Sequence, residues 1–144
     1  MKFVQVAVLA LLGSCTRGSS VAQEQRVDQL RYAPDTVEVR GTLVFEQQYG
    51  PPGYGEDTLR DLRLSVPVLR LGRPISVVGD TTNPLAGDPH SNMQRIQLTA
   101  LPQGTSVREF ENREVVVTGR LLEAVWGREY TPVVIEVIDV RRGP

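Results

Sequence analysis

Two stretches of this chain share one pattern: VEVRGTL at residues 37–43 and VVVTGRL at residues 115–121. In both, apolar residues and one glycine occupy every second position, which is the period of a β-strand with one buried face. A glycine inside such a strand lets it bend sharply, as strands do where a barrel turns a corner. The pattern therefore predicts two long, bent strands, but it is too short to demonstrate an internal duplication.

Three further segments are predicted strands. Apolar side chains alternate from Leu62 to Val68, and this segment continues to residue 79. Pro67 falls on its outward phase, where proline fits only an edge strand or a β-bulge. The stretches MQRIQLTAL (93–101) and TPVVIEVIDV (131–140) supply the other two strands.

Between the third and fourth predicted strands, GTSVREFEN (104–112) predicts one or two helical turns. Five strands with a helical connector at this place match an OB-fold, a small Greek-key barrel. We therefore expect an all-β, five-stranded OB-like barrel over residues 37–141, with a β-sandwich or an SH3-like barrel as alternatives. The expected core consists of the inward-facing residues Val39, Leu43, Leu64, Val66, Ile96, Leu98, Val115, Val117, Leu121, Val133, Ile135 and Val137.

The chain begins with the pattern of a signal peptide. Lys2 gives a positive start, and an apolar run from Phe3 to Leu12 follows it. This run is too short to cross a bilayer, which takes about 20 residues, but it has the length of a signal-peptide core. Residues 12–15, LGSC, resemble the lipobox of bacterial lipoproteins, in which the cysteine is acylated and the peptide is cut just before it. We expect removal of residues 1–14 and firm membrane anchoring through two or more acyl chains on Cys15.

Two alternatives compete with this interpretation. Cleavage after Ala22 would leave a chain that starts at Gln23, although the cut would then lie far from the apolar core and beyond Arg17. Cys15 could instead be a buried structural thiol.

Thr16 is not the aspartate that commonly retains lipoproteins in the inner membrane, so the expected location is the outer membrane, facing the periplasm.

The composition sets limits on the partners. Loss of residues 1–14 removes Lys2, the only lysine, and leaves 15 arginines against 17 acidic residues, a formal charge of −2. A nucleic-acid partner requires a strong basic excess, so we expect none. Since Cys15 is the only cysteine, no intramolecular disulfide can form, and packing alone must stabilise the domain.

Residues 15–36 contain few large apolar side chains and end in a proline turn. Such a composition is typical of a flexible tether that lifts a domain off the membrane. A short helix over residues 23–31 is the alternative. We expect a disordered tether, with the folded domain starting at Val37.

Four stretches together resemble a small bacterial domain-of-unknown-function family, number forty-four thirty-one: residues 69–80, 96–102, 109–124 and 131–137. Members of that family often carry a cysteine after the Pro-Ile pair and a histidine-rich stretch before Thr-Pro-Val. Here Ser76 and the stretch WGREY (126–130) stand at those places. The resemblance therefore implies the domain type, and it implies no metal, disulfide or activity.

Few residues are suited to catalysis. His90 is the only histidine, and it could bind a hydrolytic metal together with Asp80 and Asp88. Their spacing matches no strong metal motif, and these residue types are common in loops. No Ser-His-Asp arrangement or phosphate-binding glycine loop is present. The carboxylates at 109, 111 and 114 are predicted to be solvated. We expect neither enzymatic activity nor a cofactor.

Aromatic residues flank two predicted loops. Tyr49 and Tyr54 flank the loop after the first strand, and Trp126 and Tyr130 flank the last hairpin, with Arg128 between them. In an OB-fold these two loops border the usual ligand groove, and aromatics with arginine are frequent in binding surfaces. The alternative is that these side chains only plug the barrel mouth.

The sequence therefore predicts a non-catalytic binding module of the bacterial cell envelope. Its partner would be a glycan, a peptide or a protein, for example a toxin-like enzyme that the lipoprotein neutralises. The two alternatives are a metal-dependent hydrolase that uses His90, and a purely structural spacer.

Overall fold

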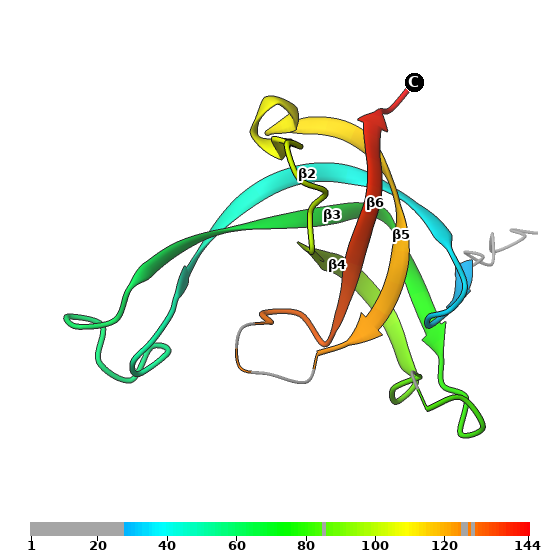
Figure 1. Ribbon diagram of the computed structural model, residues 1–144, viewed down its shortest axis with the longest axis horizontal. Helices are drawn as coiled ribbons and strands as arrows, with labels where there is room; N and C mark the ends of the chain where they lie inside the picture. Colours follow the sequence, from blue (N-terminus) through cyan, green and yellow to red (C-terminus); the bar gives the residue numbers. More distant parts are fainter. Residues whose placement is uncertain (1–27, 85, 125–126, 128) are drawn as a thin grey trace, which may run out of the picture.

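The computed structural model describes residues 28–84, 86–124, 127 and 129–144 (Figure 1). These residues form six strands and one turn of 3-10 helix. The elements are β1 (Asp28–Arg31), β2 (Val37–Tyr49), β3 (Arg63–Val78), β4 (His90–Thr99), η1 (Val107–Phe110), β5 (Arg113–Glu123) and β6 (Val133–Arg142).

Five of the strands close into a barrel. Around the barrel the order is β2, β3, β4, β6, β5 and again β2, and every pair is antiparallel except the parallel pair β4–β6. Strand β5 returns beside β2 after three consecutive strands, which is the Greek-key connection. The prediction of an all-β, five-stranded OB-like barrel is confirmed. The connector between β4 and β5 contains the single 3-10 turn η1.

The two glycines of the repeated pattern lie where neighbouring strands approach most closely. Gly41 and Gly119 are buried, and a Cβ atom on either would collide with a backbone carbonyl oxygen, that of Arg70 or that of Glu136. Gly119 also lies at a register shift between β5 and β6. The missing side chain lets the backbone of β3 approach β2 at Gly41 and the backbone of β6 approach β5 at Gly119.

We expect Gly41→Ala and Gly119→Ala each to lower the free energy of unfolding by about 1–3 kcal/mol, because the added methyl group must push a neighbouring strand away. Urea unfolding followed by circular dichroism measures the change. Gly72→Ala is the matched control, since a Cβ atom there has no neighbour within 4 Å. Equal stability of the three variants would contradict the close-approach explanation.

Most of the predicted core is confirmed. Ten of the twelve predicted side chains belong to one buried cluster inside the barrel: Val39, Leu43, Ile96, Leu98, Val115, Val117, Leu121, Val133, Ile135 and Val137. The prediction is wrong for Leu64, which is half-buried, and for Val66, which is buried outside that cluster.

The error lies in the phase of β3. Pro67 pairs with Phe45 and Leu69 pairs with Leu43, so the inner face of β3 carries Pro67 and Leu69 rather than Val66. Because alternate residues of a strand face opposite sides, the Val66 side chain points away from the barrel interior. The prediction that Pro67 lies on the outward phase is therefore wrong. Pro67 nevertheless lies where β3 lacks β4 on one side, because β4 pairs with β3 only from Val68 onward.

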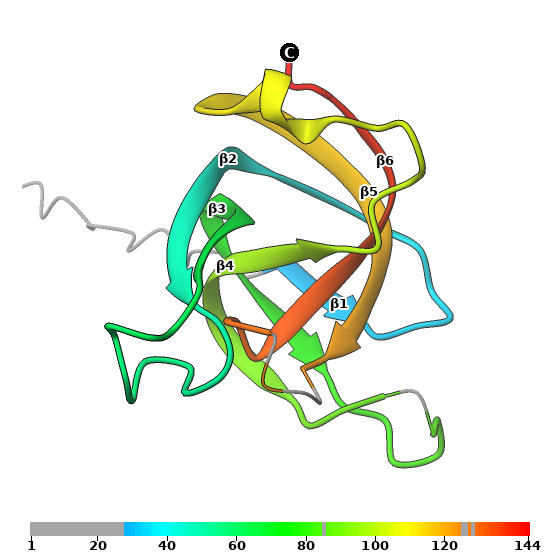
Figure 2. The same ribbon diagram turned by 60° about the vertical axis from the view of Figure 1, so that its left-hand side comes forward.

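The folded domain starts earlier than predicted. Residues 28–31 form β1, which pairs in parallel with the end of β3 (Figure 2). Tyr32 and Ala33 are 2% and 4% exposed, and the Tyr32 hydroxyl donates a hydrogen bond to the carbonyl oxygen of Asp88 (2.8 Å). The prediction of a flexible tether is therefore wrong for residues 28–36. The alternative helix is wrong for residues 28–31, because pairing with β3 satisfies this backbone as a strand.

Candidate functional site

Two loops meet at one end of the barrel. Residues 50–62 connect β2 to β3, and residues 124–132 connect β5 to β6. The Tyr130 hydroxyl joins them by donating a hydrogen bond to the carbonyl oxygen of Tyr49 (2.8 Å). Burial raises the pKa of the Tyr130 hydroxyl, and the nearby Tyr54 hydroxyl raises it further. The structure thus brings Tyr49, Tyr54 and Tyr130 together, as the sequence predicts.

The carboxylate of Asp61 stabilises the loop 50–62, together with backbone hydrogen bonds inside the loop such as those from Gly50 to Leu62 and from Leu62 to Pro51. Asp61 is 7% exposed and accepts hydrogen bonds from the backbone N–H groups of Gly53 (2.6 Å), Gly55 (2.7 Å) and Asp57 (3.2 Å). Gly55 has a φ of +107°, which a residue with a side chain rarely adopts. Hydrogen bonds from three backbone N–H groups to one carboxylate stabilise this loop conformation.

This loop exposes apolar side chains. Tyr54 is 47% exposed, Leu62 58% and Leu59 96%. At its base the guanidinium of Arg63 stacks over the Tyr49 ring, 4.6 Å from the ring centre. We use the name "loop platform" for Tyr49, Tyr54, Leu59, Leu62 and Tyr130. Sequence reasoning missed Leu59 and Asp61, and it assigned Leu62 to the alternating pattern of the next strand, whereas β3 begins only at Arg63. Nothing in the pattern around Leu59 and Asp61 distinguishes them from ordinary loop residues.

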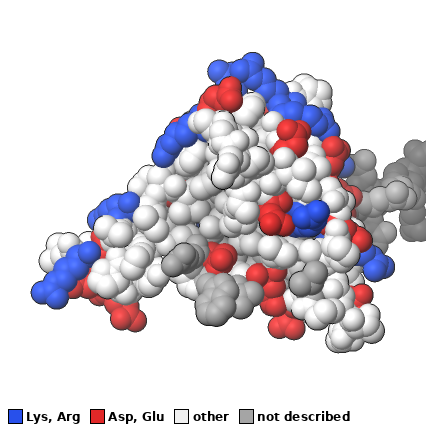
Figure 3. All heavy atoms as spheres, in the orientation of Figure 1, with Lys and Arg blue, Asp and Glu red and all other residues white. Residues whose placement is uncertain are grey.

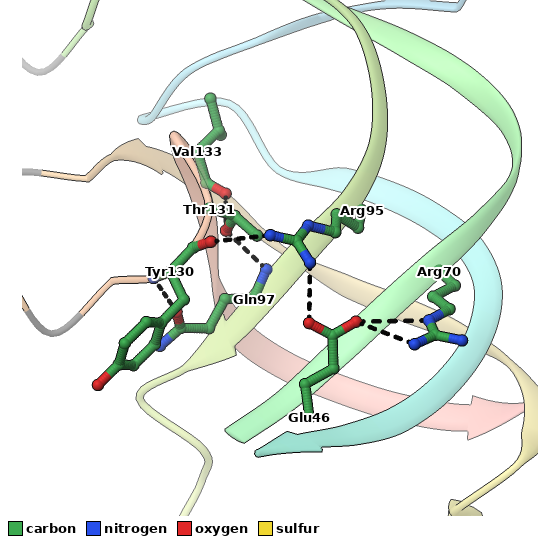
Figure 4. Close-up of polar contacts among 7 residues, drawn as sticks. All are labelled: Glu46, Arg70, Arg95, Gln97, Tyr130, Thr131 and Val133. Carbon is green, nitrogen blue, oxygen red and sulfur yellow. Dashed lines mark hydrogen bonds and ion pairs between the residues drawn. The ribbon is translucent and has the colours of Figure 1, made fainter. Parts of the chain in front are cut away.

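The second loop is anchored on β4. The side-chain oxygen of Gln97 accepts the N–H of Tyr130 (2.7 Å), and the N–H of Gln97 donates to the hydroxyl of Thr131 (3.0 Å). That hydroxyl donates to the carbonyl oxygen of Val133 (2.7 Å; Figure 4). Gln97 and Thr131 are 7% and 3% exposed. Since buried hydrogen bonds are costly to break, they fix the position of Tyr130.

A charged network lies beside this anchor. The carboxylate of Glu46 is close to the guanidinium groups of Arg70 (3.2 Å) and Arg95 (2.9 Å), and Arg95 also reaches the carbonyl oxygen of Tyr130 (3.4 Å; Figure 4). The network connects β2, β3 and β4 next to the second loop. It adds a polar border to the loop platform, as is usual around apolar binding surfaces.

Charge is mixed over the face seen in Figure 3. Acidic and basic atoms lie side by side around its edge, and a broad area between them carries neither. Among the described residues, the charges on this face therefore form no continuous patch of one sign.

The residues of the hydrolase alternative are not brought together as a metal site. Within the described part of the chain, no three histidine, cysteine, aspartate or glutamate side chains lie close enough to hold an ion. The Asp80 carboxylate accepts hydrogen bonds from the hydroxyl and N–H of Thr82, which hold the pKa of Asp80 below its usual value. His90 faces Glu123 instead, with 3.9 Å between Nε2 and the carboxylate.

Three predicted site residues, Cys15, Trp126 and Arg128, lie outside the described residues. Comparison of the chain with protein-family models, curated proteins and solved structures found no match. Among the described residues, no helix is long and apolar enough to span a membrane.

Asp61→Asn is expected to loosen the loop platform at neutral pH, because an amide has one acceptor oxygen in place of two. Desolvation raises the pKa of Asp61, but the N–H groups of Gly55, Gly53 and Asp57 outweigh it and lower the pKa below its ordinary value of 3.8. A lowered pKa means that the ionised carboxylate stabilises the folded loop above pH 3.8, and that this effect disappears as the pH falls through the lower value.

The amide proton shifts of Gly53 and Gly55, followed by NMR as the pH is lowered, measure this transition. We expect both to move together with a midpoint below 3.8 in the natural chain, and no such transition in Asp61→Asn. A midpoint at or above 3.8 would show that the carboxylate is not held by these amides.

Proposed function

We propose that this chain is a lipid-anchored, non-catalytic binding module of the bacterial cell envelope, and that it holds a protein partner on the loop platform. The acyl anchor would be Cys15 and the location the outer membrane, facing the periplasm. The OB-like barrel would serve as the rigid base. Neutralising a toxin-like enzyme is one role that fits such a module.

One observation carries this proposal: the loop platform combines exposed apolar side chains with a fixed backbone. Leu59, at 96% exposure, buries almost none of its side chain within the domain. Asp61 and Gln97 hold the two loops in place, so little conformational entropy would be lost on binding. Rigid surfaces with tyrosines and exposed apolar groups are characteristic of protein interaction sites.

A protein fits this surface better than a glycan. Sugars stack on open aromatic faces, but one face of Tyr49 is occupied by the Arg63 guanidinium, and the Tyr130 hydroxyl is engaged by Tyr49. The two exposed leucines contribute apolar area without hydrogen-bonding groups, which suits an apolar protein surface. Trp126 and Arg128, in the same loop as Tyr130, are expected to contribute to this surface.

Photo-crosslinking in the native envelope tests the proposal. A benzophenone amino acid at Leu59 is expected to give one discrete crosslinked protein, and the same group at Ile138, which is 44% exposed on β6, is expected to give none. Ile138 is the matched control for Leu59, because both positions are exposed and apolar and both would carry the same crosslinking group. Mass spectrometry of the mature N-terminus tests the anchor, and an unmodified terminus at Gln23 would refute it.

Three results would contradict the binding role. The same crosslinks at both positions would show that contact at Leu59 is unspecific. No crosslink at Leu59 would leave the barrel as a spacer. A crosslink to polysaccharide rather than protein would assign the platform to a glycan.

A further inference from the structure

A concave surface separate from the loop platform lies where β2 and β3 separate. β2 pairs with β3 only from Gly41, whose partner is Leu71, and after this point β3 pairs with β1 from Ile75 onward. A cleft of about 920 Å³ lies at this fork, between β1, the first half of β2 and the corner of β3 at residues 70–73. Its volume is within the range of known ligand pockets.

Two strand edges line this cleft. Among the described residues, Val37–Arg40 of β2 pair with β5 alone, and Asp28–Arg31 of β1 pair with β3 alone. Both strands meet the turn at residues 33–36 and diverge from it, as Figure 2 shows. An edge strand presents backbone N–H and C=O groups that lack a ladder partner on one side, and these can pair with an added strand.

The side chains in the cleft are of two kinds. Leu30 and Leu71 are partly buried and pack against the barrel core. At the rim, Arg40 is paired with Glu114, whereas Asp28 and Arg73 form no ion pair within the described part of the chain. Apolar groups below and charged groups at the rim match the alternating side chains of an extended peptide.

We propose that this cleft binds an extended segment of another polypeptide, which adds as a β-strand beside residues 37–40 of β2. The peptide backbone would pair with the edge of β2 that has no strand partner among the described residues, and every second side chain would lie over Leu30 and Leu71. Asp28 and Arg73 would favour peptides that carry oppositely charged side chains near one end. An extended peptide is favoured over a compact small molecule because a row of backbone groups is the main recognition chemistry that the cleft offers. The site is separate from the loop platform and does not depend on it.

Selection of a random library of short linear peptides against the full chain tests the proposal, followed by calorimetric titration of one enriched peptide. Gly72→Trp is the blocking variant: Gly72 lines the cleft, its Cβ position has no neighbour within 4 Å, and its φ is outside the left-handed region. We expect Gly72→Trp, and methylation of alternate backbone nitrogens of the peptide, each to weaken binding about tenfold or more. Arg73→Glu serves as a second variant if the tryptophan disturbs folding, and it should change which charged peptides are enriched.

Leu59→Ala is the matched control, because it alters the loop platform and leaves the cleft intact. Leu59→Ala should not change the affinity for the peptide. A result that contradicts the cleft proposal can therefore be distinguished from one that contradicts the proposed role of the loop platform. The proposal is overturned if no peptide is enriched, or if the enriched peptide binds both Gly72→Trp and Arg73→Glu as well as the natural chain. It is also overturned if sedimentation shows a dimer that Gly72→Trp dissociates, since the occupant would then be a second copy of this chain.

Discussion

Leu43→Ala is expected to lower the free energy of unfolding by about 2–5 kcal/mol, the range for removing a fully buried leucine side chain. Leu43 is 0% exposed and lies in the part of β2 that pairs on both sides, with Leu69 of β3 and with Arg113 of β5. Three barrel strands therefore meet at this side chain. Because their backbones are fixed by continuous ladders, the space left by the leucine cannot close by a local shift.

Urea unfolding of Leu43→Ala and Leu59→Ala measures this effect with the same chemical change at two positions. Leu59 is 96% exposed, so its replacement should change stability by no more than about 0.5 kcal/mol. A loss below about 1 kcal/mol for Leu43→Ala would show that the barrel can collapse around the missing side chain, against the packing described above.

The barrel could be predicted from the sequence because its strands carry apolar residues at alternating positions. In β5 and β6, Val115, Val117, Ile135 and Val137 lie in the barrel core as predicted, although Val116 and Val134 on the other phase are also buried, outside that cluster. The order of strands and turns then left few topologies to choose from. The repeated glycines were predicted to let their strands bend, and they lie where a Cβ atom would collide with the backbone of the neighbouring strand.

Strand β3 shows where periodicity fails. Val68 and Leu69 are consecutive apolar residues and both are 0% exposed, so both faces of the strand are buried at this point. A pattern that reads one apolar phase from Leu62 to Val68 cannot show that Leu69, on the other phase, faces the core. Only the pairing of Leu69 with Leu43 settles the phase.

The candidate site was predictable in part. Aromatic residues in two loops that an OB-like barrel places together identified Tyr49, Tyr54 and Tyr130. The residues that fix these loops were not predictable, because their partners are far apart in sequence: Gln97 binds Tyr130 across 33 positions. Asp61 is closer to its amides, but nothing in its neighbourhood distinguishes a carboxylate that caps a loop from one that is solvated.

The predicted N-terminal boundary of the domain was wrong for a different reason. A single tyrosine and one leucine carry the attachment of residues 28–33, and two apolar residues in a polar stretch do not form a periodic pattern.

Tyr32→Ala is expected to lower the free energy of unfolding by about 3 kcal/mol or more, because it removes an aromatic ring from the core. The ring is 2% exposed, belongs to the main buried cluster, and forms the bridge between the N-terminal segment and Leu121 of β5. Burial, with Glu123 and Asp88 close by, raises the pKa of the Tyr32 hydroxyl to about 12, so the group is neutral at every pH at which the domain would be measured.

Tyr32→Phe separates the ring from its hydrogen bond. This variant keeps the ring and removes only the bond to the Asp88 carbonyl, so it should cost about 1 kcal/mol. Urea unfolding of both variants, beside a chain that starts at Val37, measures how much residues 28–36 contribute. If β1 and Tyr32 belong to the domain, the shortened chain must lose at least as much stability as Tyr32→Ala. If the shortened chain is as stable as the natural one, the folded domain starts at Val37 and β1 is only an attached part of the tether. In that case β1 would not be a fixed wall of the cleft between β1 and β2.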